Sequence, residues 1–477
     1  YKIGTINING SADNELRRGE LTLDKGVMAR YVAFSVDTIS WTGIDEIQIF
    51  GRQNTEQALP ASNFTLVHVE ESKEEKRKAP SEDLLGGTEH LCLLYHSYDT
   101  NSYTVEDLIP YLTYVDKDGV MQDVMFDSFL FIHDTGEMPS GATPYDGSVK
   151  SDWVWEINDI FTEGKNIYAL DEVAGMAKQA LNLGDDYKYK VTVSLYNSGN
   201  ETTNFGDVDG DGVSENFAIF EQRMKIYKWY INEIEKRFAE SNFQNIALVG
   251  YYWWDESVNK QEPLILETLN SLSDYIHSIE RDFFWIPYHC ASGFTDWEDF
   301  GFDVACMQPN YVFKAETSYQ NLINNEALTK KYGMGVEMEI CSSSLGDKVF
   351  FKKYMEYLAL GAESGYMTDA VNMYYQERFI FKKAAYSNTL MARTVYESTY
   401  HYIKGDLKNV PDKLDKLTYN AEQNKIFKGI IPFETEKLRE FKLSAFSDHG
   451  TVIFDEDGTF YYFPQKDYVG EVKLTFV

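Results

Sequence analysis

Short apolar runs alternate with longer amphipathic segments between residues 88 and 404 of the chain. The short runs have the length of buried strands, and the segments between them repeat apolar residues every three or four positions, as helices do. The expected strands cover 90–97, 123–132, 188–197, 245–254, 283–290, 302–309, 333–340 and 363–369. Eight strands alternating with helices predict a (β/α)8 TIM-like barrel. A doubly wound sheet is the alternative, but no Gly-rich phosphate turn follows the first strand.

The two ends of the chain have a different pattern. Residues 1–53 alternate apolar and polar positions between turn residues, which predicts antiparallel strands, and the charged stretch 54–87 is expected to be a connector. After a linker at 405–418, alternation returns over 419–477 with Asp-Gly and Lys-Asp turns. The sequence therefore predicts a barrel over 88–404 that is flanked by β-sandwich-type segments at both ends.

Composition narrows the possible partners. The chain has 76 acidic and 44 basic residues and a formal net charge of −32, which argues against nucleic acid and anionic membranes as partners. No apolar run reaches the length of a transmembrane helix, so we expect no membrane insertion. Cys92, Cys290, Cys306 and Cys341 lie in apolar runs without CxxC spacing, and we expect buried free thiols rather than a zinc site.

The ends of the expected strands indicate where chemistry takes place, because barrel enzymes act at the carboxyl ends of their strands. These ends are rich in Tyr, His, Asn, Gln and carboxylates and carry no cluster of Lys or Arg, which favours a neutral polyhydroxylated ligand over a phosphorylated one. The candidate ligand-binding residues are His96, Tyr98, Tyr196, Asn197, Trp253, Trp254, Asp255, His289, Gln308, Asn310, Tyr311 and Asp369.

Three glutamates are candidates for catalysis. Glu256 follows the expected fourth strand, and Glu337 and Glu339 lie on one face of the seventh because strand side chains alternate. Glycoside hydrolysis needs two carboxyl groups on either side of the glycosidic bond. We expect Glu256 to be the acid/base, with a pKa raised by Trp253 and Trp254, and Glu339 (or Glu337) to be the nucleophile. Alternatively, Glu256 begins a solvated loop and the other two are structural ion-pair members.

The motifs GDVDGDGVSENF, ALVGYYWWDES, CMQPNY and GVEMEI give the middle region a family resemblance. The region resembles (β/α)8 glycoside hydrolases that carry an acid/base glutamate after strand four and a nucleophile glutamate after strand seven. It is most similar to the bacterial DUF4855 family, whose function is uncharacterised. The resemblance implies a retaining hydrolase. The chain departs from the retaining clan at Asp255, where that clan has an asparagine before the acid/base.

An acidic loop and three further tryptophans remain. Asp207, Asp209 and Asp211 alternate before a glycine, a spacing that can wrap carboxylates around Ca²⁺, with Glu215 or Glu221 as a further ligand. We expect a structural Ca²⁺ there, against the alternative of a solvated Asp/Gly turn, and no organic cofactor. Trp153, Trp155 and Trp297 either form stacking platforms for a sugar or pack loops onto the barrel.

The flanking segments suggest the setting in which the protein works. Residues 1–53 resemble the C-terminal part of a galactose-binding-like (discoidin-type) sandwich, and 419–477 resemble an Ig-like or cadherin-like module. We therefore expect part of a secreted, multi-domain bacterial protein, extracellular or at the cell surface. The expected function is that of a glycoside hydrolase acting on a neutral or complex glycan. A catalytically inactive glycan-binding or adhesive surface protein is the alternative, and a metal-dependent hydrolase ranks last.

Overall fold

The computed structural model describes the barrel region and parts of the C-terminal region. The described residues are Leu21, 84–97, 102–134, 136–144, 146–407, 419–430, 445–447, 449–454, 459–472 and 474–476. The chain divides into two compact units, Tyr1–Glu75 and Lys76–Val477. The expected discoidin-type segment 1–53, except for Leu21, and most of the connector 54–87 lie outside the described residues.

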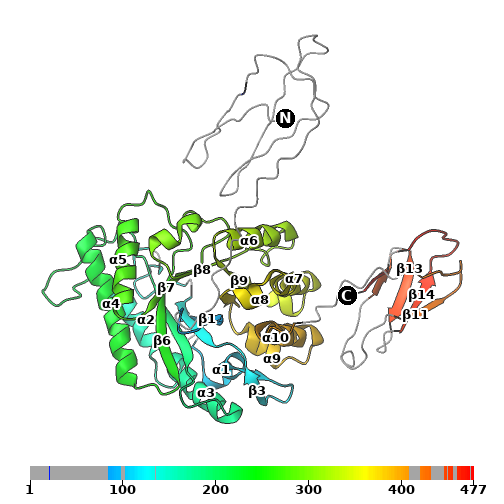
Figure 1. Ribbon diagram of the computed structural model, residues 1–477, viewed down its shortest axis with the longest axis horizontal. Coiled ribbons are helices and arrows are strands. Elements are labelled where there is room, and N and C mark those ends of the chain that lie inside the picture. Colours follow the sequence, from blue (N-terminus) through cyan, green and yellow to red (C-terminus); the bar gives the residue numbers. More distant parts are fainter. Residues whose placement is uncertain are drawn as a thin grey trace, which may run out of the picture. The chain divides into compact units, whose positions relative to one another are not determined.

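Eight parallel strands of the second unit form a closed barrel (Figure 1). Their order around the barrel is β1-β10-β9-β8-β7-β6-β5-β4. The strands are β1 (His90–His96), β4 (Ser128–His133), β5 (Tyr189–Leu195), β6 (Ile246–Trp253), β7 (Asp282–Trp285), β8 (Val304–Met307), β9 (Gly335–Glu339) and β10 (Asn372–Tyr375). The predicted (β/α)8 fold is confirmed. β6 and β9 are the fourth and seventh barrel strands, as the alternation predicts.

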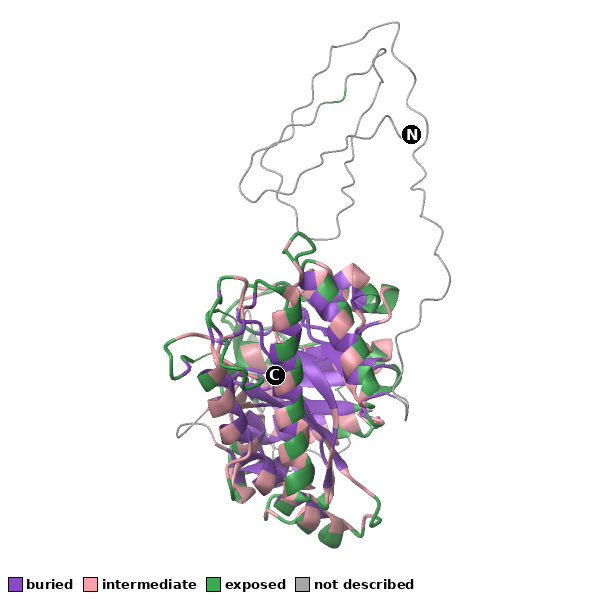
Figure 2. Ribbon diagram, turned by 90° about the vertical axis from the view of Figure 1, so that its left-hand side faces the viewer, coloured by how far each residue is buried: buried purple, intermediate pink, exposed green. Residues whose placement is uncertain are grey.

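Helices surround the barrel, with their buried faces toward the strands and their exposed faces outward (Figure 2). They are α1 (Val105–Leu112), α2 (Lys150–Ile160), α3 (Asn166–Leu181), α4 (Phe220–Ser241), α5 (Ile265–Ser278), α6 (Tyr319–Lys331), α7 (Lys348–Ser364), α8 (Tyr366–Asp369), α9 (Ile380–Ala385) and α10 (Leu390–Ile403). In α7, the Asp347 side chain accepts a hydrogen bond from the Val349 N–H at the start, and Gly365 (φ 97°) ends the helix in a left-handed conformation. Of the helices in the described ranges, none is both long and apolar enough to cross a membrane.

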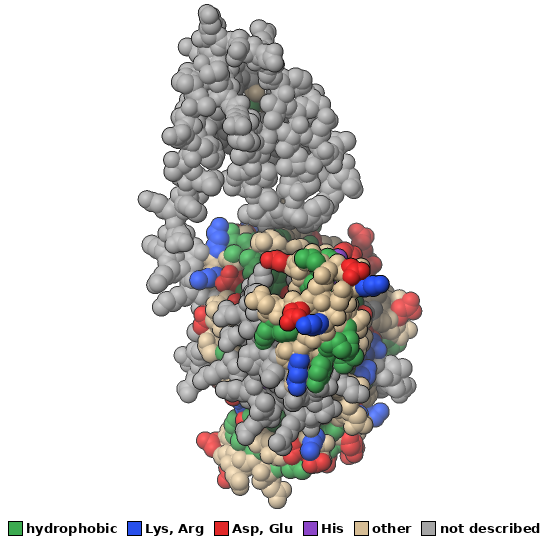
Figure 3. All heavy atoms as spheres, turned by 90° about the vertical axis from the view of Figure 1, so that its right-hand side faces the viewer, with side chains coloured by type: hydrophobic (Ala, Val, Ile, Leu, Met, Phe, Trp, Pro, Cys, Tyr) green, Lys and Arg blue, Asp and Glu red, His purple; other side chains and the backbone are tan. Residues whose placement is uncertain are grey.

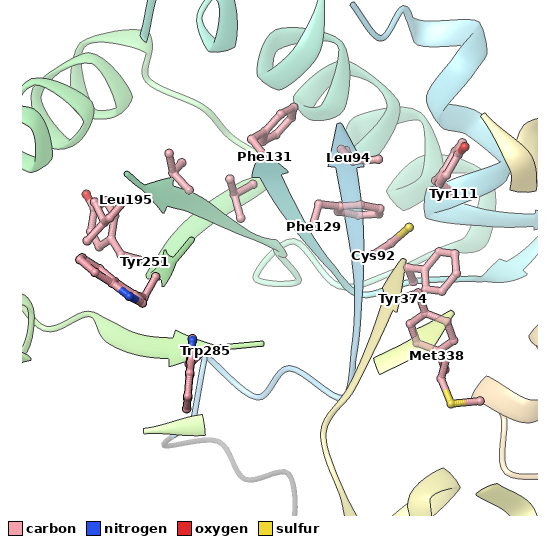
Figure 4. Close-up of a cluster of buried hydrophobic side chains, with 14 of the residues drawn as sticks. Cys92, Leu94, Tyr111, Phe129, Phe131, Leu195, Tyr251, Trp285, Met338 and Tyr374 are labelled. Carbon is pink, nitrogen blue, oxygen red and sulfur yellow. The ribbon is translucent and has the colours of Figure 1, made fainter. Parts of the chain in front are cut away.

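Two apolar clusters hold the barrel, one on each side of its wall. The larger lies between strands and helices and includes Cys92, Phe131 and Trp285 (Figure 4). The smaller fills the barrel interior with residues from alternate strand positions and from segments next to the strands, namely Leu84, Leu85, Leu91, Leu93, Leu130, Ile132, Tyr252, Phe284, Ile286, Val304, Cys306, Val371 and Met373. The interior is therefore a packed core, which leaves the strand ends for ligand binding.

The cysteines support the prediction from their spacing. All four are free thiols, and Cys92, Cys306 and Cys341 are buried, whereas Cys290 is half-buried. Burial raises the pKa of the Cys92 and Cys306 thiols well above the usual value. These thiols pack as small apolar side chains.

Two expected strands need correction. The stretch 123–132 contains the end of β3 (Met121–Val124), which pairs antiparallel with β2 (Thr113–Val115), and only then the barrel strand β4. The expected strand at 363–369 is wrong, because those residues form the end of α7 and α8. The eighth strand is β10, and Asp369 lies before its first residue. Asp369 is therefore an exposed residue at the amino end of the barrel, away from the expected ligand site.

The described part of the C-terminal region consists of antiparallel strands, as the alternation predicts. One sheet has the order β11-β14-β13, with β11 at Phe427–Ile430, β14 at Thr459–Pro464 and β13 at Gly450–Phe454. A second pairs β12 (Ala445–Ser447) with β15 (Leu474–Phe476). Phe460 and Tyr462 of β14 are buried in a small apolar cluster. The Ig-like or cadherin-like identity of this region stays a prediction.

Candidate active site

Glu256 stands just beyond the end of β6, at the carboxyl end of the barrel. Its Oε1 accepts a hydrogen bond from Gln308 Nε2 at 2.9 Å, and the same amide group donates to the Ile286 carbonyl at 3.1 Å. The residue is exposed to solvent. The protein around it nevertheless removes enough water to raise the pKa of Glu256, and the Gln308 hydrogen bond only partly opposes this. A raised pKa is what a general acid needs.

Asp255 is held beside Glu256 by Asn197, so the structure brings two more predicted residues to this end of the barrel. Asn197 Nδ2 donates to Asp255 Oδ2 at 2.8 Å. Burial raises the pKa of Asp255 to about 7, the Asn197 hydrogen bond opposes that shift, and the charges of Glu262 and Glu256 add to it.

Glu339 accepts three hydrogen bonds at the end of β9. Its Oε1 accepts the Asn310 N–H at 3.0 Å, and its Oε2 accepts the Tyr311 N–H at 3.1 Å and the Tyr357 hydroxyl. Burial raises the pKa of Glu339 to about 7, although these three donors lower it. The side chain has no exposed surface. The donors fix the direction of this carboxyl group and favour its charged form.

Glu337 lies two residues before Glu339 on the same face of β9 and has a different environment. It is 3% exposed. Among the described residues, it has no hydrogen-bond or ion-pair partner. Burial raises its pKa well above the usual value, and the charges of Glu339 and Glu256 raise it further. We call Asp255, Glu256, Glu337 and Glu339 the mouth carboxyls.

Three tyrosines that the sequence did not single out lie beside the mouth carboxyls. The hydroxyls of Tyr95 and Tyr252 have pKa values raised well above the usual range, first by burial and then by neighbouring charges that include Glu337 and Glu256. Tyr375, the last residue of β10, makes an edge contact with Tyr95 at 5.6 Å between ring centroids. The alternation of side chains along the strands could have identified Tyr95 and Tyr252, because both lie on inward strand faces, as interior residues such as Leu93 do.

His96 and Tyr196 lie outside the mouth, behind the barrel wall. His96 Nδ1 contacts Asp159 Oδ2 at 2.7 Å and its Nε2 lies 3.2 Å from Glu156 Oε1. Glu156 also accepts from the Tyr196 hydroxyl at 2.7 Å and contacts His133 Nδ1 at 2.8 Å. We call His96, His133, Glu156 and Asp159 the buried ion network. Because all their side chains are at most 1% exposed, we interpret His96 and Tyr196 as structural, against the expectation of ligand binding.

The charges of the buried ion network stabilise one another. Burial would lower the pKa of His96, but Glu156 and Asp159 raise it to about 10. Burial opposes ionisation of Glu156 too, yet His96 and His133 hold the pKa of that carboxyl well below its usual range. His96 and Glu156 therefore remain charged at neutral pH.

The tryptophans divide between wall and mouth. Trp253 is 1% exposed and packs on Tyr227 of α4, with 6.1 Å between ring centroids, so it cannot contact a ligand as expected. Trp254 is half-buried and contacts the interior cluster. Trp153 and Trp297 are buried and donate to Ser148 Oγ and the Tyr332 carbonyl, which supports the packing alternative for both. Trp155 is half-buried, 5.4 Å from the His133 ring.

The remaining candidates have mixed positions. Asn310 and Tyr311 supply backbone donors to Glu339, and the Tyr311 hydroxyl donates to Glu356 at 2.5 Å. His289 Nδ1 lies 3.1 Å from Asn325 Oδ1, and burial lowers the pKa of its ring. Tyr98 lies outside the described residues.

The acidic loop between β5 and α4 brings Asp207, Asp209 and Asp211 together, with one oxygen of each within 4.8 Å of the others. Lys225 Nζ forms an ion pair with Asp209 at 2.6 Å. Glu215 Oε2 accepts the Val208 N–H at 2.8 Å, so this carboxyl group faces the loop backbone. The Ca²⁺ site stays a prediction, because the aspartates already accept hydrogen bonds from backbone N–H groups of the loop and Lys225 is a competing partner.

Fold and site together define a (β/α)8 barrel whose mouth carries acidic residues after the fourth strand and on the seventh. The chain belongs to the DUF4855 family, a domain of unknown function that matches residues 90–401. No curated protein matches the chain.

Solved structures are similar to the barrel at low identity. A candidate alpha-L-fucosidase from Bacteroides thetaiotaomicron VPI-5482 is 14% identical, with 70% of this chain and 98% of that chain covered and a TM-score of 0.39. A fungal beta-1,4-galactanase is 12% identical (66% and 99% covered, TM-score 0.35). Tryptophan synthase from M. tuberculosis is 7% identical (70% and 94% covered, TM-score 0.32). Enzymes of different chemistry occur among these matches, so we draw no conclusion about the reaction from them.

Proposed function

We propose that the protein is an extracellular or cell-surface glycoside hydrolase that acts on a neutral or complex glycan with retention of configuration. Glu256 is the acid/base, and a strand-seven glutamate is the nucleophile. The observation that carries this proposal is the pairing of Glu256, after the fourth strand, with Glu337 and Glu339 on the seventh at one barrel mouth. The charge of Glu256 raises the pKa of both strand-seven glutamates, so the three carboxyls interact.

The hydrogen bonds favour Glu339 over Glu337 as the nucleophile. A nucleophile must be ionised, and Glu339 has three donors that favour its anion, whereas Glu337 has none among the described residues. Glu256, with one amide donor and a raised pKa, suits the proton donor. The step is then attack of the Glu339 oxygen on the anomeric carbon, while Glu256 gives its proton to the leaving oxygen.

The surface is compatible with a glycan partner. On the face drawn in Figure 3, described basic side chains lie singly among acidic ones rather than in one patch. A nucleic-acid partner would need such a patch.

The complete burial of Glu339 supports a second function. A nucleophile must contact its substrate, and Glu339 has no exposed surface in the free protein. A catalytically inactive barrel that binds glycan would leave Glu339 as a structural acceptor for the backbone at Asn310 and Tyr311.

The test is hydrolysis of a glycan panel by wild type, Glu256→Gln, Glu337→Gln and Glu339→Gln, with the anomer of the first product followed by NMR. We expect Glu256→Gln to lower kcat by about 10²–10⁴ and Glu339→Gln to abolish turnover. Glu280→Gln, at an exposed residue beyond α5, is the matched control. Activity that survives both Glu256→Gln and Glu339→Gln would contradict the mechanism, and binding without any hydrolysis would favour the second function.

A further inference from the structure

The barrel mouth has more carboxyl groups than glycoside hydrolysis requires. Two carboxyls suffice for the reaction, and the mouth has four. Among the described residues, no lysine or arginine forms an ion pair with Asp255, Glu256, Glu337 or Glu339. All four have raised pKa values. The mouth is therefore short of positive charge in the free protein.

Glu337 is the least compensated of the four. It is 3% exposed and, in the part of the chain that the structure describes, accepts no hydrogen bond. Glu337 follows Gly335 on the face that turns inward, and Gly335 pairs with the interior residue Cys306 of β8. A buried carboxyl group without partners is unfavourable, and a protein that keeps one has a position ready for a ligand group that supplies the missing donor.

A metal ion does not fit this arrangement. Among the described residues, the Asp207, Asp209 and Asp211 group is the one in which three or more acidic, His or Cys ligand atoms come within 4.8 Å of one another. No three of the mouth carboxyls therefore converge on one point as the ligands of a protein-held ion do. Carboxyls spread around a rim suit an organic cation that reaches one of them while the rest of the ligand spans the mouth.

The aromatic neighbours of Glu337 suit an ammonium group as well. The charge of Glu337 contributes to the raised pKa of the Tyr95 and Tyr252 hydroxyls, and Tyr95 contacts the ring of Tyr375. Ring faces attract cations, and tyrosine hydroxyls accept hydrogen bonds from an ammonium group.

We infer that the mouth takes a sugar with a free, protonated amino group, and that Glu337 binds this group beside Tyr95 and Tyr252. The inference rests on the proposed function, because it assigns the substrate class of the same site. Asp255 adds to the negative charge that the amino sugar meets. Glu256 and Glu339 remain available for the reaction.

The test measures binding rather than turnover. In the full chain carrying Glu256→Gln, calorimetry compares methyl glycosides of glucosamine, galactosamine and mannosamine, in both anomers, with their N-acetyl and 2-hydroxy counterparts. The measurements are made at about pH 7, where the amine is still largely protonated and its ammonium group can replace the proton that the raised pKa of Glu337 retains in the free protein. At least one free-amine glycoside is expected to bind about tenfold or more tightly than both counterparts. Adding Glu337→Gln is expected to reduce this preference to about twofold or less, whereas Glu280→Gln leaves it unchanged.

The outcomes separate this inference from the proposed function. Equal binding of all three forms, or a preference that survives Glu337→Gln in a folded variant, overturns the inference. If Glu337→Gln does not fold, Asp255→Asn replaces it and is expected to weaken the preference by several-fold. A clear preference in a protein that cleaves no glycan supports the inference and contradicts the hydrolase. Hydrolysis of neutral glycans without any preference does the reverse.

Discussion

The buried ion network and the mouth carboxyls both place acidic side chains at the carboxyl end of the barrel strands. In the first, Glu156 lies between His96 and His133 and also accepts a hydrogen bond from Tyr196. In the second, Glu337 lies in a similar degree of burial with no cation beside it among the described residues. The pKa of Glu156 is lowered and that of Glu337 is raised, although burial alone would raise both.

The difference separates two roles of a buried acid. Glu156 and Asp159 come from α2, on the outer side of the wall, where the chain also provides two histidines as permanent partners. Glu337 faces the barrel interior, where none of the described residues supplies a hydrogen-bond donor or a cation to it. A carboxyl group that the protein neutralises itself serves the fold, whereas one left uncompensated at a barrel mouth indicates a ligand site.

Glu156→Gln breaks the compensated group and has the largest expected effect on stability. The amide leaves the charge on His96 with Asp159 as its remaining acidic partner, so the free energy of unfolding at pH 7 should fall by about 3–5 kcal/mol. Urea denaturation of wild type and variant measures the change. A fall of less than about 1 kcal/mol would mean that the network contributes little to the fold.

The same network gives a pH dependence with a definite sign. His96 has a folded-state pKa of about 10, above its value of 6.5 in the unfolded chain. Its contribution to stability is therefore complete below pH 6.5 and is lost as the pH rises toward 10. In the wild type the free energy of unfolding should decline over that range, and His96→Gln should flatten this decline.

Glu337→Gln should have the opposite and smaller effect. The pKa of Glu337 is raised on folding, so the folded protein holds the proton more tightly and stability falls as the pH rises above the unfolded value of 4.5. Glutamine has no such loss. The variant should unfold like wild type near pH 4 and be more stable by about 1 kcal/mol or more at pH 8, since one pKa unit corresponds to about 1.4 kcal/mol. Thermal unfolding at both pH values measures this, and a variant less stable than wild type at pH 8 would contradict the uncompensated state.

The sequence predicted the buried ion network and the mouth carboxyls only as far as it showed which strand residues point inward and which point outward. The alternation of strands and helices predicted the barrel, and the spacing of Glu337 and Glu339 placed both on one face of the strand, because both signals are periodic. His96 was assigned to the ligand site on its position at a strand end, but it points outward, while its neighbour Tyr95 points inward. Counting positions along 91, 93 and 95 would have corrected that choice.

Other features had no local signal. The partners of His96 lie on α2, about sixty residues away in the chain, and only the folded structure brings Glu156 and Asp159 to it. The eighth strand was misplaced because "ESGYMTD" has the length and aromatic content of a strand, yet the glycine at 365 ends a long helix. The donors of Glu339 also come from a different loop and helix.

Phe313→Ala tests whether the rim beside the mouth carboxyls contacts the ligand. Phe313 is 40% exposed and lies 5.5 Å from the Tyr375 ring, which continues the aromatic contact from Tyr95. Loss of a stacking ring should weaken ligand binding or raise KM by about 2–10-fold with little change in unfolding, as aromatic pairs contribute about 0.5–1.5 kcal/mol. Met176→Ala, at an exposed residue of α3, is the control. If Phe313→Ala and Met176→Ala change ligand binding equally, Phe313 does not contact the ligand.

The smallest effect on stability is expected from Ca²⁺ binding to a third acidic group, the loop with Asp207, Asp209 and Asp211. Lys225 compensates the negative charge of this loop only in part. Asp207, Asp209 and Asp211 converge as the mouth carboxyls do not, but Lys225 already neutralises Asp209 and lowers the pKa of that carboxyl. Ca²⁺ must displace Lys225 or bind beside it, so we expect a gain of about 1 kcal/mol in unfolding free energy at a concentration several times the dissociation constant. Thermal unfolding with Ca²⁺ and with EDTA measures this gain, and Asp211→Asn should abolish it. If Ca²⁺ changes the unfolding of neither the wild type nor Asp211→Asn, the loop is an Asp/Gly turn whose charge Lys225 partly balances. Its aspartates then bind no ligand and serve the fold, as Glu156 does.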